Sequence, residues 1–248
     1  MILTTIKPTL AKSYDGQDVS GWLMSEKLDG VRAIWNGEDF ISRNGNVFDV
    51  PESFKAAMPS VALDGELWMG RGKLQETVSV IRSGKQDPRW EQIKFHVFDA
   101  PMFDATFQER IKYCAELLES NLFAVAVPHS RCGSQIDLHL LCRQIVSDGA
   151  EGLMVRDPNS QYIQGRTNKL LKYKIITSDE GKVISTTGKL DSIAVEWRGM
   201  IINLGTGFDA ATRKNPPAIG SIVTFEYRGF TDSGLPRNTS FVSVRDYE

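Results

Sequence analysis

The pattern of apolar residues changes near Lys174, and this change most limits how the chain can fold. Before that point, strand-like runs alternate with segments of helical spacing, over about residues 73–83, 105–119 and 134–147. Beyond about residue 178 the helical spacing disappears, and short runs rich in β-branched and aromatic residues follow one another. We therefore predict an α+β domain over residues 1–175 and a small, closed, antiparallel five-stranded β-barrel over residues 176–248.

Two of the predicted helices carry boundary signals. Asp104 precedes the second helix and is predicted as its N-cap, because a side-chain oxygen there accepts a hydrogen bond from a free backbone N–H group. Asp148-Gly149 is predicted to end the third helix, since glycine tolerates the left-handed conformation that commonly follows a helix.

The overall charge is close to zero. With 29 Lys and Arg against 31 Asp and Glu among 248 residues, the formal net charge is −2. This balance supplies no global field that would attract a polyanion. A nucleic acid would therefore have to be bound by a local basic surface.

The chain carries no signal of a membrane protein or a secreted protein. No apolar run approaches the roughly 20 residues that span a bilayer. The start, MILTTIKPTLAKSY, lacks a basic head followed by an apolar core, so we expect a cytoplasmic protein without membrane contact. A periplasmic location stays open for a form whose leader was removed before residue 1.

The three cysteines, Cys114, Cys132 and Cys142, form no CxxC pair, which argues against zinc and a disulfide framework. Cys114 lies in a helical apolar pattern and is predicted to be a buried thiol.

Short polar motifs follow one another in a fixed order before residue 175. Lys27-Leu28-Asp29-Gly30 alone is a weak signal, but it belongs to a series of six. In chain order these are EKLDGVR at 26–32, SRNG at 42–45, LDGEL at 63–67, FHVFD at 95–99, EGLMVR at 151–156 and LLKYK at 170–174.

This series resembles the covalent nucleotidyltransferase superfamily, which includes DNA ligases, RNA ligases and mRNA capping enzymes. With the β-rich tail, the resemblance covers nearly the whole chain. It is strongest to minimal bacterial ATP-dependent DNA ligases, which consist of an adenylation domain and an OB-fold domain. The resemblance implies an adenylation domain over 1–175 and an OB-fold over 176–248.

In this family a lysine attacks the α-phosphate of ATP, and the resemblance assigns that role to Lys27, which would carry AMP as a lysyl-AMP intermediate. The attacking amine must be neutral, and nearby positive charge and desolvation favour that form. Arg32, Lys174 and a bound Mg²⁺ are the expected sources of positive charge. If the segment is a strand, Lys27 and Asp29 project from one face.

The resemblance also assigns the nucleotide contacts. Glu26 and Arg32 would contact the nucleotide, Glu66 the ribose, and Phe98 would stack on adenine. Lys172 and Lys174 would face the phosphates, because two ammonium groups on one strand face need anions opposite. Glu151 and Glu66 would hold Mg²⁺, or Mn²⁺ in its place, since hard cations prefer oxygen ligands.

Other residues are predicted to contact DNA. Arg43, in the turn Ser42-Arg43-Asn44-Gly45, would bind the 5′-phosphate of a nick, and Asp29 would orient Lys27 or contact the nick. Basic residues that are predicted to contact the backbone of duplex DNA are Arg166, Arg198, Arg213, Lys214, Arg228 and Arg237. Arg245 and Asp246 resemble a shortened final motif that acts in the first step, although the lysine often found after it is absent.

The sequence thus predicts a monomeric ATP-dependent DNA ligase that seals nicks in duplex DNA. Two alternatives stay open at this point. One is an RNA-end enzyme, either an RNA ligase or a capping guanylyltransferase. The other is an OB-fold DNA-binding protein without catalysis, which would leave the six ordered motifs unexplained.

Overall fold

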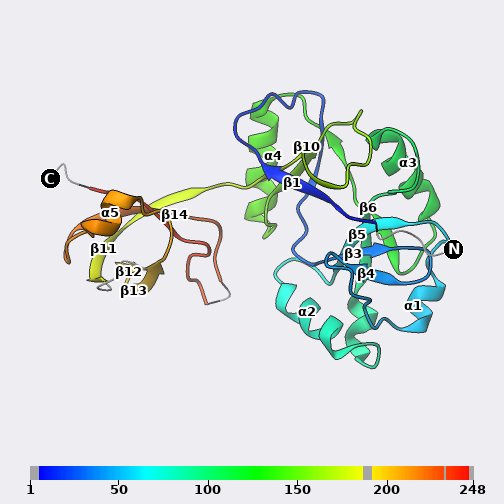
Figure 1. Cartoon of the computed structure of the whole chain (residues 1–248), viewed down its shortest axis with the longest axis horizontal. Helices are drawn as coiled ribbons and strands as arrows, with labels where there is room; N and C mark the ends of the chain where they lie inside the picture. Colours follow the sequence, from blue (N-terminus) through cyan, green and yellow to red (C-terminus); the bar gives the residue numbers. More distant parts are fainter. Residues whose placement is uncertain (1–5, 187–191, 232, 246–248) are drawn as a thin grey trace. The chain divides into compact units, whose positions relative to one another are not determined.

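The computed structural model describes residues 6–186, 192–231 and 233–245. The chain divides into two compact units, Met1–Tyr173 (unit 1) and Lys174–Glu248 (unit 2) (Figure 1). No helix in the described ranges is long and apolar enough to cross a membrane.

Unit 1 contains two five-stranded sheets. The first, here called the β2 sheet, has the order β1 (Thr9–Ser13), β10 (Gly165–Tyr173), β9 (Leu153–Arg156), β2 (Leu23–Glu26) and β8 (Ser130–Arg131). The second, the β3 sheet, has the order β4 (Phe40–Ser42), β3 (Val31–Trp35), β5 (Leu63–Trp68), β6 (Lys94–Asp99) and β7 (Ala124–Ala126). Strands β1 and β10 pair in parallel, as do β6 and β7, and the other pairs are antiparallel.

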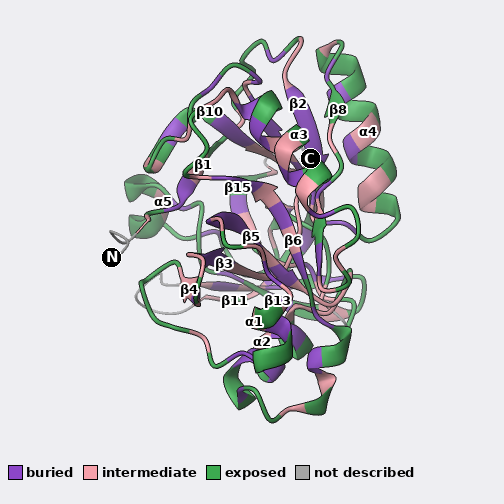
Figure 2. Cartoon of the chain, turned by 90° about the vertical axis from the view of Figure 1, so that its right-hand side faces the viewer, coloured by how far each residue is buried: buried purple, intermediate pink, exposed green. Residues whose placement is uncertain are grey.

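The helices of unit 1 agree with the predicted ranges. They are α2 (Leu74–Ser83), α3 (Phe107–Leu117) and α4 (Gln135–Ser147), together with the shorter α1 (Glu52–Ala56) and the 3₁₀ helix η1 (Pro88–Gln92). Apolar residues of α1, α2 and α3 pack on the β3 sheet in one core cluster. Figure 2 shows buried residues in the strands of both units and exposed residues along the helices.

The ends of two helices test the predicted boundary signals. The turn Asp148-Gly149 does end α4, with Gly149 at φ +90°. The predicted N-cap Asp104 was wrong, because α3 begins at Phe107 and its cap is Thr106. Thr106 and Glu109 form a capping box, in which the Thr106 N–H donates to the Glu109 carboxylate at 2.9 Å.

Unit 2 is a single antiparallel sheet with the strand order β13-β12-β11-β14-β15, accompanied by the short helix α5 (Ala210–Lys214). The bounds of the strands are β11 (Thr177–Thr186), β12 (Ile193–Trp197), β13 (Met200–Leu204), β14 (Ile222–Tyr227) and β15 (Ser240–Val244). Alternate residues of these strands, among them Val183, Val195 and Phe225, form one buried core. Five antiparallel strands were predicted, and five are present among the described residues.

The predicted closed barrel was wrong. Within the described residues the edge strands β13 and β15 do not form a ladder, so the sheet stays open. They approach at one corner, where the Phe241 N–H donates to the Thr206 carbonyl at 2.9 Å. Gly207 makes this approach feasible, because a Cβ atom at that position would lie 2.0 Å from the Phe241 carbonyl oxygen.

Candidate functional site

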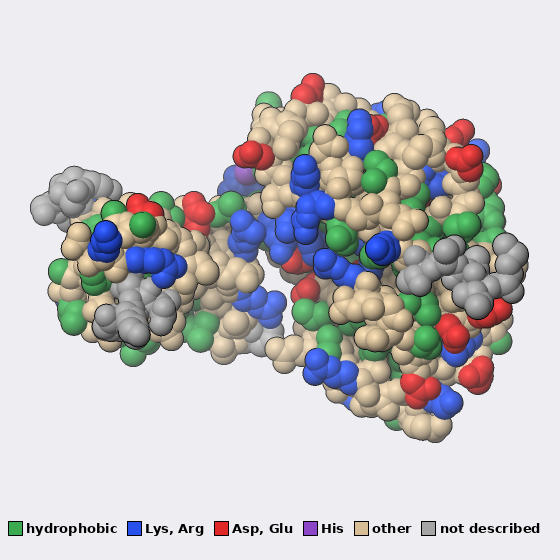
Figure 3. Space-filling view, in the orientation of Figure 1, with side chains coloured by type: hydrophobic (Ala, Val, Ile, Leu, Met, Phe, Trp, Pro, Cys, Tyr) green, Lys and Arg blue, Asp and Glu red, His purple; other side chains and the backbone are tan. Residues whose placement is uncertain are grey.

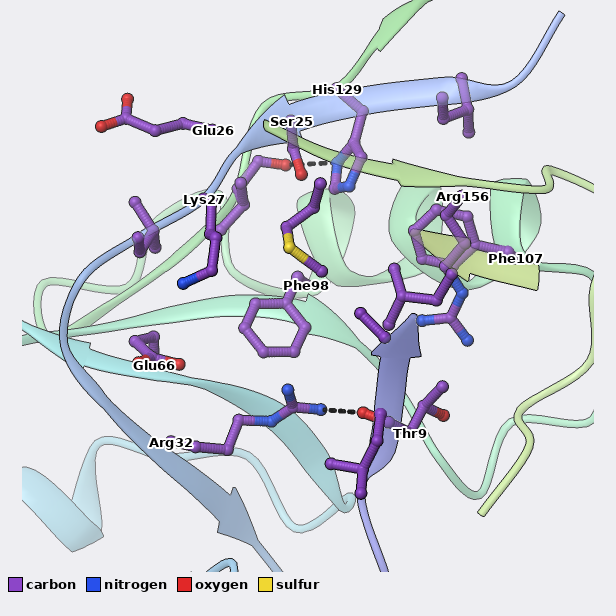
Figure 4. A pocket seen from close by; sticks show the side chains of 17 residues that line it. Thr9, Ser25, Glu26, Lys27, Arg32, Glu66, Phe98, Phe107, His129 and Arg156 are labelled. Atoms are coloured by element: carbon purple, nitrogen blue, oxygen red, sulfur yellow. Dashed lines mark hydrogen bonds between the residues drawn. The ribbon is translucent and has the colours of Figure 1, made fainter. Parts of the chain in front are cut away.

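A pocket of about 170 Å³ lies between the two sheets of unit 1. This is more than ten times the space of about 10–15 Å³ that one water molecule needs. Strands β1, β2, β9 and β10 form one wall, and β3, β5 and β6 contribute to the opposite wall. The structure thus brings five of the predicted residues into one pocket, namely Glu26, Lys27, Arg32, Glu66 and Phe98 (Figure 4).

Lys27 lies in the connection between β2 and β3, which spans residues 27–30. The strand predicted through Lys27 and Asp29 is therefore interrupted there, and both residues belong to a loop. The Lys27 N–H donates to the Gly152 carbonyl at 2.8 Å, which ties this loop to the segment before β9. Its ammonium group forms an ion pair with Glu151. Two predicted residues thus contact each other directly.

Glu26 ends β2 and is held by Arg71 from the loop between β5 and α2. The guanidinium donates two hydrogen bonds to the Glu26 carboxylate, each of 2.8 Å, and a third of 3.0 Å to the Asp148 carbonyl. Arg71 therefore connects a loop of the β3 sheet with the two segments that carry Lys27 and Glu151.

Arg32 is oriented by a buried carboxylate. Its Nε and Nη2 donate to the two oxygens of Asp64 at 2.6 and 2.7 Å, and the Tyr162 hydroxyl donates to the same carboxylate at 2.7 Å. Burial would lower the pKa of Arg32, but the charge and hydrogen bonds of Asp64 raise it above its usual value. The guanidinium also lies over the Phe98 ring, 4.5 Å from its centroid, and so covers one face of the ring.

Glu66 lies opposite Arg32 in the pairing of β3 with β5. Burial raises the pKa of Glu66 to about 7, although the charges of Arg32 and Lys27 and a hydrogen bond from the Gly30 N–H oppose the shift. Near pH 7 this carboxyl therefore exists in both protonation states. A cation in the pocket would favour the ionised form.

Arg156, which lines the end of the pocket away from Lys27, belongs to a buried ionic cluster. Asp99 accepts from Arg110 at 2.6 Å and from Arg156 at 2.6 Å, and all three side chains are almost fully buried. Arg156 also stacks over the Phe107 ring at 4.2 Å, and its Nε has no hydrogen-bond partner among the described residues. The Phe107 ring contacts His129 edge-on, with 5.4 Å between centroids.

Lys172 and Lys174 differ in their placement. Lys172 lies on β10 directly opposite Met154, which lines the pocket, so its side chain shares that face of the sheet. Lys174 follows the end of β10 and is the first residue of unit 2.

Arg43 lies in a tight turn at the end of β4, outside the pocket. The Gly45 N–H donates to the Ser42 carbonyl at 2.9 Å, and Gly45 has φ +87°. Arg43 is exposed and lines a shallow hollow that it shares with Gly30 and Arg32. On the face of unit 1 seen in Figure 3, several Lys and Arg side chains gather.

The remaining predicted DNA contacts in unit 1 and unit 2 lie on strands, turns and α5. Arg166 is on β10 and donates to the Ala11 carbonyl at 2.8 Å. Arg198, at φ +50°, turns β12 into β13, lies over Trp197 at 4.7 Å and pairs with Asp179 at 3.0 Å.

Four other basic residues of unit 2 lie in two pairs. Arg213 and Lys214 end α5, and Arg228 and Arg237 are linked across a hairpin by the Arg228 N–H and the Arg237 carbonyl at 2.9 Å. Arg245 forms an ion pair with Glu180, whereas Asp246 lies outside the described residues.

No group of three or more His, Cys, Asp or Glu side chains that would cage a metal ion exists in the part of the chain that the structure describes. The predicted metal ligands Glu66 and Glu151 are two carboxylates near the same lysine. This donor set suits Mg²⁺, which keeps several waters and needs few protein ligands, better than a cation that requires a full protein cage.

Sequence reasoning missed several residues that line the pocket or hold its lining residues in place. Asp64 and Arg156 lie within the motifs LDGEL and EGLMVR but received no role, and their buried partners are far away in the sequence. Tyr162, His129 and Arg71 lie outside all six motifs, so no local pattern indicated them.

Comparison with known proteins gives two family matches. The family described as "ATP dependent DNA ligase domain" matches residues 4–174, and the family described as "DNA ligase OB-like domain" matches residues 181–245. A DNA ligase of Haemophilus influenzae is 35% identical, and the match covers 94% of this chain and 90% of that protein.

Solved structures show the same similarity. A chain from a study of "DNA binding with a minimal scaffold", a structure-function analysis of Lig E DNA ligases, is 36% identical with a TM-score of 0.88, over 98% of this chain and 100% of that one. Chlorella virus DNA ligase-adenylate shares the fold at 24% identity and a TM-score of 0.60, over 96% of this chain and 99% of that one.

Proposed function

Because the chain belongs to the family of ATP-dependent DNA ligases, we propose that it joins a 5′-phosphate to a 3′-hydroxyl at nicks in duplex DNA, with Lys27 as the nucleophile. The family that the motifs resemble is thereby confirmed. The observation that carries the role of Lys27 is its position at a pocket that also contains Arg32, Glu66 and Phe98.

In the first step, the neutral Lys27 amine attacks the α-phosphorus of ATP. A P–N bond forms, the bond from that phosphorus to the bridging oxygen breaks, and pyrophosphate leaves. The Lys27–Glu151 ion pair must separate before this step, because the nitrogen that contacts the carboxylate is the atom that must reach the phosphorus. Glu151 therefore holds the lysine in place until the nucleotide is bound.

The next two steps use the same site. An oxygen of the 5′-phosphate attacks the phosphorus of lysyl-AMP, which releases Lys27 and leaves AMP on the DNA end. The 3′-hydroxyl then loses its proton, attacks the 5′-phosphorus and displaces AMP, which completes the phosphodiester. Charge develops on phosphoryl oxygens in each step, so cationic groups around them lower the barriers.

Glu66 and Glu151 are the residues that would hold Mg²⁺, and the ion would supply positive charge beside the phosphates. The raised pKa of Glu66 supports this assignment, because a buried carboxyl gains more from a nearby cation than a solvated one does. We assign adenine stacking to the ring face of Phe98 that Arg32 leaves uncovered, and the phosphates to Lys172 and Lys174.

The DNA contacts are part of the proposal. Arg43 would bind the 5′-phosphate, since it is exposed on a tight turn and shares a shallow hollow with Arg32. The other basic residues predicted from the sequence would contact the backbone. We further propose that the enzyme works as a monomer, with residues 1–175 as adenylation domain and 176–248 as OB domain, and that it is cytoplasmic.

Covalent labelling tests the central step. The protein is incubated with ATP labelled at the α-phosphate and with Mg²⁺, denatured, and analysed for label on the polypeptide. Label is expected on the native chain and on the control Lys112→Ala, which changes an exposed lysine of α3, but not on Lys27→Ala. Undiminished label on Lys27→Ala would exclude Lys27 as the nucleophile.

Sealing assays test the substrate. A nicked DNA duplex is expected to be joined, while the matching RNA duplex is joined at least tenfold more slowly. Faster joining of the RNA duplex would assign the enzyme to RNA ends instead.

A further inference from the structure

The strand pairing shows where the base of the nucleotide would lie, if Lys27 binds the α-phosphate as proposed above. Side chains on one face of β2 alternate, so Leu23 and Ser25 follow each other along the pocket wall about 6.6 Å apart, and Lys27 comes directly after the end of the strand. The phosphate is at the Lys27 end. The base, which lies beyond the ribose, therefore reaches the level of Ser25.

Two neighbours flank Ser25 at this level. Met154 of β9 pairs directly with Ser25. On the other side, β2 pairs with β8 through Leu23–Arg131 and Met24–Ser130, and the same register continued by one residue places His129 opposite Ser25. Figure 4 shows the imidazole of His129 directed from this edge into the pocket.

The hydrogen bonding of His129 determines what its free nitrogen can do. Nδ1 lies 2.8 Å from the Val127 carbonyl, which can only accept, so Nδ1 carries the proton. In a neutral imidazole Nε2 is then an acceptor, and no described residue bonds to it. Burial lowers the pKa of His129 to about 4, which keeps the ring neutral at physiological pH.

The ring of His129 is also fixed in orientation. Phe107, the first residue of α3, contacts it edge-on at an interplanar angle of 77°. Phe107 is held in turn by Arg156, which the buried Asp99 orients. The acceptor is therefore presented by a rigid, largely buried support, which is what selective recognition of a ligand group requires.

We infer that His129 is a specificity-determining residue, whose Nε2 accepts a hydrogen bond from the exocyclic amine of adenine. An acceptor selects a donor, so adenine is favoured over a purine that presents a carbonyl oxygen at the same position. Ser25 and Arg156 are also buried polar side chains on this wall. The Ser25 hydroxyl can both donate and accept, so it does not discriminate between an amine and a carbonyl, whereas Arg156 carries only donors. Recognition through Arg156 would favour the carbonyl instead.

The experiment compares three nucleotides in the covalent labelling assay: ATP, purine riboside triphosphate, which lacks the amine, and inosine triphosphate, which has a carbonyl there. Initial rates at subsaturating nucleotide are measured for the native chain, His129→Leu and the control His139→Leu, a histidine on α4 that contacts Tyr173. The native chain and the control are expected to prefer ATP over purine riboside triphosphate by about 10- to 100-fold.

In His129→Leu this preference is expected to fall to within about threefold, while the rate with purine riboside triphosphate stays near the native value and shows that the variant is folded. His129→Gln, whose side chain retains an acceptor, serves as the second variant and is expected to keep part of the preference.

An unchanged preference in His129→Leu, or a native preference for inosine triphosphate, would overturn the assignment. Absence of label with every nucleotide on the native chain would instead contradict the proposed function itself, so the two failures are distinguishable.

Discussion

Glu66 has a protonation state that depends on its burial between Arg32 and Lys27. Its pKa of about 7 in the folded chain lies above the ordinary value of 4.5. Between these two pH values the folded protein keeps a proton that the unfolded chain releases. The stabilising contribution is therefore complete below pH 4.5 and is lost as the pH rises through about 7.

We expect the free energy of unfolding of the native chain to fall by about 2–3 kcal/mol relative to Glu66→Gln between pH 5 and pH 8, in the absence of nucleotide and metal. Urea unfolding followed by tryptophan fluorescence measures this, because four of the five tryptophans lie in unit 1. If the free energy of unfolding of the two proteins depended on pH in the same way, the raised pKa of Glu66 would be contradicted.

Gly30 is required by the close approach of the loop before β3 to strand β5. A Cβ atom there would lie 2.5 Å from the Leu67 carbonyl oxygen and 2.9 Å from the Glu66 Cγ. We expect Gly30→Ala to lower stability by about 1–3 kcal/mol and to reduce the labelling rate at least tenfold, since Glu66 must move.

Gly16→Ala provides the comparison for this variant. Gly16 has φ +81°, but a Cβ atom at that position would meet no other atom within 4 Å, so alanine adds backbone strain without displacing a pocket residue. Its stability should fall while its labelling rate stays native. Equal labelling rates in the two variants would show that contact with Glu66 is irrelevant.

Helix α3 begins beside the pocket. Thr106 is its N-cap, and Phe107, its first residue, lines the pocket. We expect Thr106→Ala to lower the free energy of unfolding by about 1 kcal/mol, and Thr106→Ser to restore most of it. Chemical unfolding measures both. Equal stability of the alanine and serine variants would show that the hydroxyl makes no contribution.

At the level of elements, the sequence predicted those that carry a long periodic pattern. The three longer helices each show two or more turns of apolar spacing. In contrast, α1, η1 and α5 have five residues each, which is too short for a period to be recognised. The run SIAVEWRGMII contains a single internal turn residue, Gly199, and Arg198 and Gly199 both adopt a positive φ, which divides the run into β12 and β13.

The residues of the pocket were predictable from the sequence only where a local motif indicated them. Its motif residues lie on strands of the two sheets or directly beside them, and their order along the chain identified them. Asp64 and Tyr162 are 98 positions apart, and the hydrogen bond between them depends on how the two sheets face each other. The way in which two sheets face each other is a property of the tertiary structure, which no local sequence pattern encodes.

For the whole molecule, the net charge of −2 means that DNA binding must come from local basic groups rather than from a global field. Each phosphate contact contributes about −0.9 to the slope of log affinity against log salt concentration. A variant that loses one contact should therefore show a shallower slope.

We expect Arg43→Ala to reduce the magnitude of this slope by about 1 and to weaken binding to all nick sequences alike. Fluorescence anisotropy with a nicked duplex, measured between about 50 and 200 mM salt, tests this, with Lys112→Ala as the control for loss of one positive charge. An equal slope for Arg43→Ala and the native chain would remove Arg43 from the DNA contacts.

The burial of all three cysteines makes it possible to label the two units with dyes at chosen positions. Cys114, Cys132 and Cys142 are inaccessible and form no disulfide, and burial raises the pKa of Cys114 to about 12. Thiol-reactive dyes should therefore attach selectively to cysteines introduced at exposed positions. Leu122 in unit 1 and Ile219 in unit 2 are 80% and 68% exposed. A dye pair at these positions would test by energy transfer whether the distance between the units changes during a catalytic cycle, in a chain with all its native thiols.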